Sequence, residues 1–356
     1  MTRKGIIKRA KYACALACRK CKWISNVITN ITYPKWMDNN GQVLEDVRKR
    51  FRMDKEYSVS ELHELYKDVY FCSVYYSMEP EEYFRYRFDY LSYDERNEYV
   101  SQYFLTHKFS KICDKESKQI LSSKEKTALL FGDYFNRDVV CIKDMADKDK
   151  FLEFIQKHKS FIRKPLISRG GGHGVSIINV ENNEEQIFQS LIADGSSLCE
   201  QIIEQADGMK KYHPQSVNTI RVVTCMRDQV PEIVQTSIRI GMGDSVVDNG
   251  CLSAAVDISS GEIITPARNA HSAGLYESHP DTNERILGSI VPHWTELMEM
   301  MKVLPCMLPN QQVIGWDMAL SNDGWVMIEG NTNPAIQILA GDGIGVKRLF
   351  DTITTK

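Results

Sequence analysis

Residues 161–180 read FIRKPLISRGGGHGVSIINV, and this stretch is the strongest single indication of the fold. Four glycines and a histidine gather in it, namely Gly170, Gly171, Gly172, His173 and Gly174. The residues after the glycines are mostly β-branched, which favours a strand, and the apolar residues before them lead to Lys164. A glycine-rich loop between two strands predicts a β-hairpin. The two best-known phosphate-binding loops open a helix instead, so neither of them fits.

The hairpin loop admits two interpretations. Glycines allow backbone N–H groups to approach an anion closely, and Lys164 would supply a point charge. The loop would then be a flap over a nucleoside triphosphate. An ordinary mobile hairpin explains the same residues equally well, and both interpretations stay open at this point.

Composition excludes several classes of protein. The chain has 356 residues, 43% hydrophobic and 26% charged, which is typical of a soluble protein with two or three domains. A net charge of −3 gives no general case for nucleic-acid binding. Ten cysteines without a signal peptide indicate reduced thiols and a cytoplasmic setting. No apolar run is long enough to span a bilayer.

Residues 1–30 are basic and precede the first acidic residue, Asp38. Apolar residues recur at helical spacing among the charges, which predicts a basic amphipathic helix. Such a helix can lie on an anionic membrane, so one hypothesis is peripheral contact with the inner face of the membrane. The alternative is a helix that packs on the protein and exposes its basic face.

Residues 1–115 as a whole predict a mostly helical N-terminal region. Ser58 and Glu61 have the spacing of a helix start, and Pro80 fits the first turn of another helix. The part from 40 to 115 is rich in aromatic residues. An aromatic stripe is more often a core face than a platform on which sugars or bases stack, and we expect the core here.

From Ser122 onward, helices and strands are expected to alternate, which predicts an α/β or α+β arrangement. We place one subdomain at 116–200, with the glycine-rich loop, and a second at 201–356. The second subdomain begins a series of hairpins at 216–224. Its last hairpin joins strands at 313–320 and 325–329.

That last hairpin carries the sharpest chemistry. Asp317 lies inside an apolar strand, and Glu329 ends the next strand, two residues before Asn331. A carboxylate in such a strand is costly unless it is paired or binds a metal. Two carboxylates and an amide oxygen suit Mg²⁺ that bridges phosphates. Satisfied polar residues at a sheet end are the alternative, and the three together favour the metal.

Taken together, these residues resemble the ATP-grasp superfamily, and most closely its sugar-transfer-associated branch, which is related to α-L-glutamate ligases. The resemblance covers residues 122–343. The motifs that carry it are RKP at 163–165, the 170–174 loop, EQII at 200–203, VNTIRVVT at 217–224, GDSVVDN at 243–249, GWD at 315–317 and IEGNTNP at 328–334. It implies an α+β ATP-grasp fold of two α+β subdomains with ATP between them, preceded here by the helical region.

The resemblance also implies roles for single residues. Lys164 would contact ATP, the 170–174 loop would form the flap, and Lys126 would lie on the phosphate side, with Lys124 an open alternative. Asp317, Glu329 and Asn331 match the Mg²⁺ ligands. The hinge whose backbone reads adenine would consist of Glu200, Gln201, Ile202 and Ile203.

Two departures from the family pattern affect the catalytic residues and the substrate. Many relatives have an arginine two residues before the metal aspartate, where this chain has Gly315. Arg221 or Arg239 would then stabilise the transferred phosphoryl group. The helical N-terminus replaces a domain that often helps to bind the carboxylate substrate, so the resemblance leaves the substrate open.

The resemblance implies an ATP- and Mg²⁺-dependent ligase that joins a carboxylate to an amine through an acyl-phosphate. We expect small or sugar-linked substrates, for example an amino acid and a sugar acid in cell-surface polysaccharide or sugar-conjugate synthesis. Nucleic acid is not an expected partner. One alternative is a phosphotransferase that uses the same site. Another is a non-catalytic nucleotide-binding scaffold.

Overall fold

The computed structural model describes residues 17–18, 20–52, 55–166, 174–181, 183–193, 195–244, 252–269, 271–336 and 345–354. By its contacts the chain forms two compact units. Unit 1 comprises 1–108, 268–275 and 335–356, and unit 2 comprises 109–267 and 276–334. Loop residues Gly170, Gly171, Gly172 and His173 lie outside the described residues, as does most of the predicted helix at 1–30.

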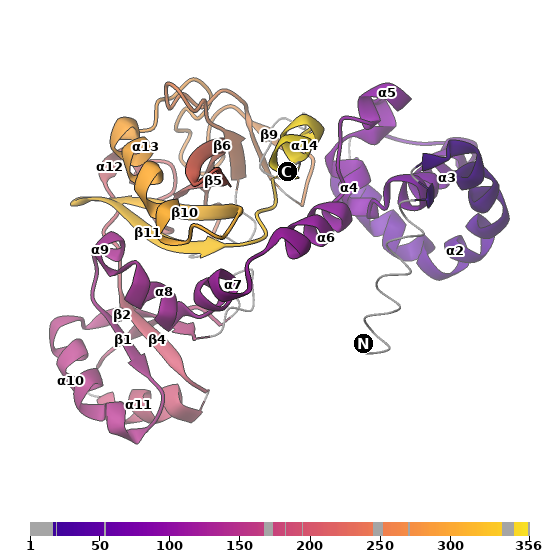
Figure 1. The fold of residues 1–356 in the computed structure, drawn as a ribbon. Helices are drawn as coiled ribbons and strands as arrows, with labels where there is room; N and C mark the ends of the chain where they lie inside the picture. The colour runs from indigo at the N-terminus through magenta and orange to yellow at the C-terminus, as the bar shows by residue number, and fades with distance from the viewer. Residues whose placement is uncertain are drawn as a thin grey trace. The chain divides into compact units, whose positions relative to one another are not determined.

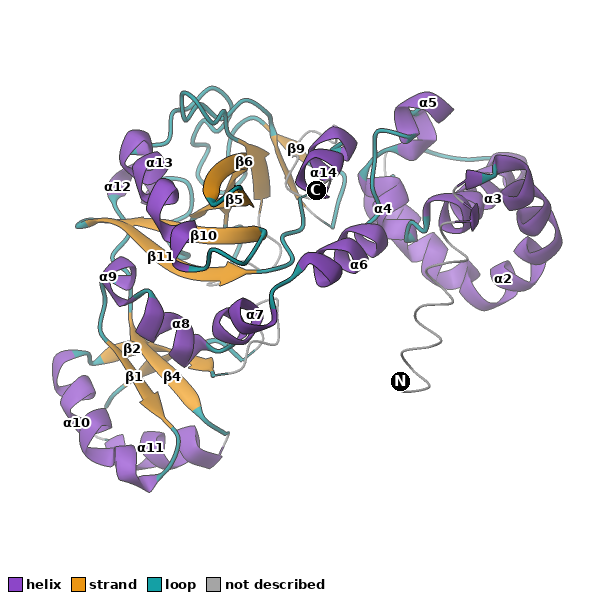
Figure 2. Ribbon diagram, viewed as in Figure 1, coloured by secondary structure: helices purple, strands orange, loops and turns teal. Residues whose placement is uncertain are grey.

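The first part of the chain is helical, as the sequence predicts (Figure 2). The helices that precede the first strand are α2 (Lys22–Phe51), α3 (Val59–Tyr76), α4 (Pro80–Arg85), α5 (Tyr93–Arg96), α6 (Gln102–Ile112), α7 (Lys115–Ser122), α8 (Lys124–Leu130) and α9 (Gly132–Phe135). Within 1–30, the backbone of Cys21 is extended, and α2 begins at the next residue. The membrane hypothesis for this segment stays a prediction.

Two predicted helix starts are confirmed. The Ser58 hydroxyl accepts a hydrogen bond from the backbone N–H of Glu61, and the Glu61 carboxylate accepts one from the backbone N–H of Ser58, directly before α3. Pro80 is the first residue of α4. These caps satisfy N–H groups that have no partner inside the helix.

The core of unit 1 is aromatic. Tyr76, Tyr83, Phe84 and Phe88 are almost fully buried, and they belong to one cluster with residues of α2 and α3. Their rings meet mostly edge to face, an arrangement that stabilises aromatic pairs beyond the area they bury. Most of the aromatic stripe is therefore a core, as expected.

Unit 2 contains an antiparallel four-stranded sheet in the order β1-β4-β2-β3. Its strands are β1 (Val139–Ile142), β2 (Ser160–Pro165), β3 (Ser176–Asn179) and β4 (Ser197–Gln201). The helices α10 (Lys148–Lys157) and α11 (Glu184–Ala193) bury their apolar residues in one cluster with the sheet and cover one face of it (Figure 1). β2 pairs with β3, so the predicted hairpin around the glycine-rich loop is confirmed.

A seven-stranded sheet lies mostly in unit 2, in the order β11-β10-β5-β6-β7-β8-β9, and only residues 268–275 at its β8-β9 end are counted with unit 1. Its strands are β5 (Thr219–Arg227), β6 (Val230–Ile240), β7 (Leu252–Ala255), β8 (Ala267–Asn269), β9 (Leu275–Tyr276), β10 (Val313–Ser321) and β11 (Gly324–Asn331). The remaining helices are α12 (Asp207–Lys210), α13 (Trp294–Val303) and, in unit 1, α14 (Lys347–Thr354). The central strands β5 and β10 are buried almost throughout.

The fold class is α+β, as predicted, with two sheets preceded by a helical region. Within the described ranges, no helix is both long and apolar enough to cross a bilayer.

Candidate active site

A row of polar side chains crosses the seven-stranded sheet at the middle of β10. Asp317 lies opposite Arg221 of β5 on one side and opposite Glu329 of β11 on the other. Directly paired residues on one face of an antiparallel sheet have Cβ atoms about 5 Å apart, so the three side chains meet. The register therefore brings together a predicted catalytic arginine and two of the predicted metal ligands.

Arg221 and Asp317 form a buried, two-pronged ion pair. The guanidinium donates through Nε to Oδ1 and through NH2 to Oδ2, the latter at 2.7 Å. Arg239 adds a second positive charge, with NH1 3.5 Å from Oδ2 of Asp317. Replacing such a pair by apolar residues is often neutral or stabilising, so a buried ion pair in a sheet is weak evidence for a stabilising role. A functional role is the more economical explanation.

The two carboxyl groups of the row have opposite pKa shifts. Burial acts to raise the pKa of Asp317, but the charges of Arg221 and Arg239 outweigh it and lower that pKa. The Glu329 side chain is 45% exposed, yet desolvation and the Asp317 carboxylate raise its pKa. A hydrogen bond with the Glu329 side chain also contributes to the lowered pKa of Asp317. Neighbouring carboxylates need a shared proton or a cation between them.

The third predicted metal ligand, Asn331, lies opposite Gly315 in the same strand pair. A Cβ atom added to Gly315 would lie 2.9 Å from Cβ of Pro334, and 3.4 Å from Cδ of Arg221 and from Oδ1 of Asn331. The absence of a side chain at 315 therefore leaves room for Arg221 and Asn331. This supplies a physical reason for the departure from the family pattern at this position.

These residues fit a hard divalent cation by their donor set. Asp317, Glu329 and Asn331 offer carboxylate and amide oxygens, the ligands that Mg²⁺ prefers. Desolvation and, after it, the Asp317 carboxylate raise the pKa of Glu329, and a bound cation would favour its ionised form. In the part of the chain that the structure describes, no three His, Cys, Asp or Glu side chains form a metal-binding group by themselves, so the amide is needed as a ligand.

A second buried charge cluster lies in the four-stranded sheet around Glu200 of β4. Lys164 donates to Oε2 at 2.7 Å, and Arg137 donates to the same oxygen from NH2 at 2.9 Å and from Nε at 3.1 Å. Only 4% of the Glu200 side chain and 3% of the Arg137 side chain are exposed. The structure therefore places the carboxylate of Glu200 against Lys164, whereas the sequence-based prediction used its backbone.

The pKa values of Glu200 and Lys164 are both lowered in this cluster. Burial alone would raise the pKa of Glu200, but the charges of Lys164 and Arg137 lower it to about 2. Burial lowers the pKa of Lys164, with a further contribution from Arg137, and the Glu200 carboxylate opposes the change. Glu200 thus stays ionised and orients the ammonium group of Lys164.

Sequence reasoning missed Arg137. Besides Glu200, it donates through NH1 to the backbone carbonyls of Phe135 at 3.0 Å and Met327 at 2.7 Å. Met327 belongs to β11, so one guanidinium ties the four-stranded sheet to the strand that carries Glu329. Arg137 lies two residues before β1, and nothing local in the sequence indicates a partner 190 residues away.

The rest of the predicted adenine hinge follows Glu200. Gln201 pairs with Asp138 through its backbone N–H, 2.9 Å from the Asp138 carbonyl, and through its side-chain oxygen, 3.1 Å from the Asp138 N–H. Ile202 and Ile203 continue the chain beyond β4 and are partly buried. Their assignment as the adenine hinge stays a prediction.

Of the two lysines considered for the phosphate side, Lys124 lies at the charge row. Its Nζ is 3.8 Å from Oε2 of Glu329, and its backbone N–H donates to the carbonyl of Leu166, just after β2. Lys126 is exposed, and its backbone N–H donates to the Ser123 cap of α8. The position favours Lys124 for this role.

Of the glycine-rich loop predicted to form the flap, residues 170–174, the structure describes Gly174. Its φ of +81° lies in the left-handed region, and an added Cβ atom would lie 2.8 Å from Cγ of Pro165. Glycine is therefore required where the chain enters β3.

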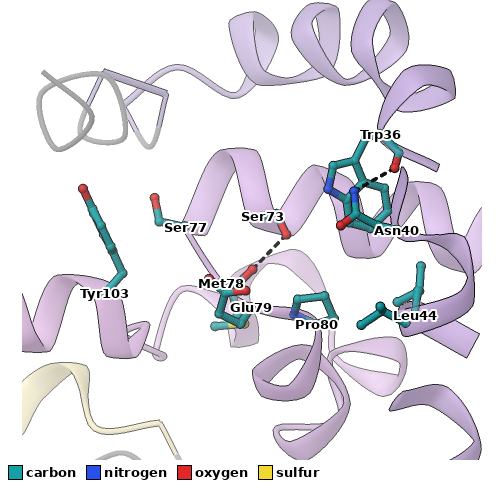
Figure 3. Close-up of a pocket in the computed structure, with 10 residues that line it drawn as sticks. Trp36, Asn40, Leu44, Ser73, Ser77, Met78, Glu79, Pro80 and Tyr103 are labelled. Atoms are coloured by element: carbon teal, nitrogen blue, oxygen red, sulfur yellow. Dashed lines mark hydrogen bonds between the residues drawn. The ribbon is translucent and has the colours of Figure 1, made fainter. Parts of the chain in front are cut away.

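A separate cavity of about 440 Å³ lies among the helices of unit 1 (Figure 3). Trp36 and Asn40 border it on one side and Tyr103 on the other (Figure 3). Two of its polar side chains bond to nearby backbone, since Asn40 donates to the Trp36 carbonyl and Ser73 to the Met78 carbonyl. None of the residues predicted for ATP or metal binding lines this cavity.

Comparison with known proteins relates this geometry to a family. A family model described as sugar-transfer associated ATP-grasp matches residues 94–353, which is more than half of the chain. A search among curated protein sequences finds no match.

Similar solved structures include two ligases. D-alanyl-alanine synthetase A from Vibrio cholerae is 11% identical, with 68% of this chain and 63% of that chain covered and a TM-score of 0.43. VanG D-Ala:D-Ser ligase from Enterococcus faecalis is 13% identical, with the same coverage and TM-score. The chain thus spans less than two thirds of the length of either protein.

Proposed function

Since the chain belongs to the sugar-transfer associated ATP-grasp family, we propose that it is an ATP- and Mg²⁺-dependent ligase that joins a carboxylate to an amine. The observation that carries the proposal is the row in which Asp317 lies between Arg221 and Glu329. The buried Arg221–Asp317 ion pair beside the Glu329 carboxyl group suits the binding of metal and phosphate. Such a pair adds little to the stability of a fold.

The proposed reaction has two steps. An oxygen of the carboxylate substrate attacks the γ-phosphorus of ATP, the bond to the bridging oxygen breaks, and ADP leaves. The amine then attacks the acyl carbon of the acyl-phosphate, the bond to the phosphate oxygen breaks, and the amine nitrogen loses a proton. Both steps bring anions together, so positioning and charge neutralisation supply most of the catalysis.

We assign the charged residues to these demands. Lys164, oriented by Glu200, binds ATP phosphate. Lys124 of α8, which lies near Glu329, is a second lysine that would contact phosphate. Arg221 and Arg239 lie beside Asp317, where they would stabilise the transferred phosphoryl group. Such donors act strongly in a partly dehydrated site because little water screens their charge.

Mg²⁺ would be held by Asp317, Glu329 and Asn331. When bound, it neutralises phosphate charge. The protein's own contribution is to keep Asp317 ionised through Arg221, which the lowered pKa of Asp317 supports.

The family description, which mentions sugar transfer, supports a proposal for the substrate class. We propose a sugar acid, or another sugar-linked carboxylate, as the acyl donor and an amino acid as the amine, in the synthesis of a cell-surface polysaccharide or sugar conjugate.

The test is product analysis by mass spectrometry over a panel of carboxylates and amines with Mg²⁺ and ATP. A ligase yields a coupled product, ADP and phosphate only when both substrates are present. The variants Asp317→Asn and Glu329→Gln should lose at least a hundredfold in turnover. The matched control is Asp323→Asn, because Asp323 is exposed in the turn of the same hairpin.

The result distinguishes the alternatives. A phosphorylated product without an amine would identify a phosphotransferase. If both variants turned over Mg²⁺-ATP as the natural protein does, the site assignment would be wrong.

A further inference from the structure

A small cavity of about 90 Å³ lies within unit 1, between α4 and the segment 268–275. Four of its ten lining residues are arginines, and none is acidic. The arginines are Arg52, Arg85, Arg87 and Arg268. The volume holds several water molecules, which is the size of one oxyanion and not of a whole nucleotide.

Two of the arginines are buried and held in place. Arg52 is 4% exposed and donates to both oxygens of Asp89, at 2.7 and 2.6 Å. It also donates to the carbonyl oxygens of Phe51 and Phe84. Arg85 is 8% exposed, with NH2 3.5 Å from a carboxylate oxygen of Glu81. Contacts within the protein therefore hold two buried, charged side chains in the wall of the cavity.

The other two arginines come from loop and strand. Arg87 is exposed, has a left-handed φ of +56°, and places its guanidinium 4.6 Å from the ring centre of Tyr90. Arg268 donates from NH1 to the carbonyl of Arg85 at 3.0 Å, so 268–275 is joined to α4 directly at the cavity. A bulky residue held at positive φ is uncommon, and such strain gathers at binding sites.

Three carboxylates lie near these arginines. Asp89 is occupied by Arg52, and Glu81 is shared between Arg85 and Arg50, whose NH2 is 2.6 Å from it. Glu82 is also close, but it accepts the backbone N–H groups of Glu79 and Gln102. Burial raises the pKa of Glu82, and its backbone hydrogen bonds and the charge of Arg85 oppose the change.

We propose that this cavity binds the oxyanion of a small ligand, either the carboxylate or the phosphate of a sugar derivative. Arginine suits this task because its planar fork of N–H donors matches carboxylate and phosphate oxygens. The cavity takes the anionic group, and the half-exposed Tyr90 is available to the ring of a sugar. The sugar part of the proposal rests on the proposed function, whereas the oxyanion site rests on unit 1 alone.

The experiment is titration calorimetry on the full chain without ATP, with inorganic phosphate, glucuronate and glucose 1-phosphate as probes and glucose as the neutral control. At least one anionic probe should bind, and more weakly in high salt. Arg87→Gln and Arg268→Gln should each weaken that binding about tenfold, the usual effect of losing one hydrogen bond to a charged group. The matched control is Arg227→Gln, a partly exposed arginine of unit 2.

The choice of probe identifies the ligand. Binding of phosphate and glucose 1-phosphate alone assigns a phosphate group, and binding of glucuronate alone assigns a carboxylate. The proposal is overturned if the anionic probes bind no better than glucose, or if Arg87→Gln, which alters an exposed side chain, binds them as the natural protein does. Lys164→Gln separates this site from the ligase site, because it removes a charge assigned to ATP phosphate in unit 2 and should leave probe binding in the unit 1 cavity unchanged.

Discussion

At the scale of single residues, each chemically important charge in unit 2 is defined by its partner. Glu200 is ionised because Lys164 and Arg137 surround it, and Asp317 is ionised because Arg221 and Arg239 do the same. Neither carboxylate would be stable in a buried strand alone.

Glu200 should therefore govern part of the acid stability. Its pKa in the folded protein, about 2, lies below the unfolded value of 4.5, so it contributes stability above the unfolded pKa that is lost as pH falls toward 2. The shift corresponds to about 3 kcal/mol. In urea unfolding between pH 6 and pH 2.5, Glu200→Gln should be less stable at pH 6 and should lose less stability on acidification. An unchanged pH profile would contradict the assignment.

Gly315→Ala tests the space beside Arg221. The added methyl group would lie 2.9 Å from Cβ of Pro334, so the strand pair must shift, at a cost of about 1–3 kcal/mol. Activity should fall at least tenfold because Arg221 and Asn331 would move. The control is Gly132→Ala, where an added Cβ atom meets nothing within 4 Å. Equal effects of the two substitutions on turnover would argue against the explanation given for Gly315.

At the scale of elements, local capping and strand register have separate roles. The capping box at Ser58 starts α3, whose buried face contributes to the aromatic core. The register of β5, β10 and β11 instead determines which side chains share the candidate site. The first feature concerns stability, and the second concerns chemistry.

Ser58→Ala should lower the free energy of unfolding by about 1 kcal/mol, since it removes the acceptor for the Glu61 N–H. Ser60→Ala is the matched control. Ser60 is exposed in the same turn, and alanine is the better helix former there. Chemical denaturation followed by circular dichroism measures both, and ligase turnover should be unaffected in either variant.

At the scale of the whole molecule, the structure separates two proposed binding tasks. The oxyanion cavity lies in unit 1, whereas the residues assigned to ATP and metal lie in unit 2. Binding in unit 1 and binding in unit 2 can therefore be followed separately, each by a measurement on residues of that unit.

Saturating Mg²⁺-ATP should slow amide hydrogen exchange in β2, β4, β10 and β11, while α3 should be unaffected. When the free Mg²⁺-ATP concentration is a hundred times its dissociation constant, binding adds about 2.7 kcal/mol to the free energy of unfolding. Removing Mg²⁺ with a chelator, or introducing Asp317→Asn, should abolish most of that protection. Protection that persisted in Asp317→Asn with chelator present would argue against the metal assignment.

The sequence by itself determined the family, the α+β class, the helix starts at Ser58 and Pro80, and the hairpin that joins β2 to β3. Such features depend on residues close together in the chain, through capping, alternation of apolar residues and turn-forming glycines. The family match over 94–353 confirms the resemblance first seen in short motifs.

Only the tertiary structure decided the partners of the charged residues. Arg221 meets Asp317 across 96 positions of sequence, and Arg137 meets the carbonyl of Met327 across 190. The sequence predicts Lys126 for the phosphate side, with Lys124 as an alternative, and the fold places Lys124 of α8 near Glu329, while the role itself stays a prediction. The physical reason is that strand order and register in a sheet depend on the packing of the whole core, and no local pattern specifies them.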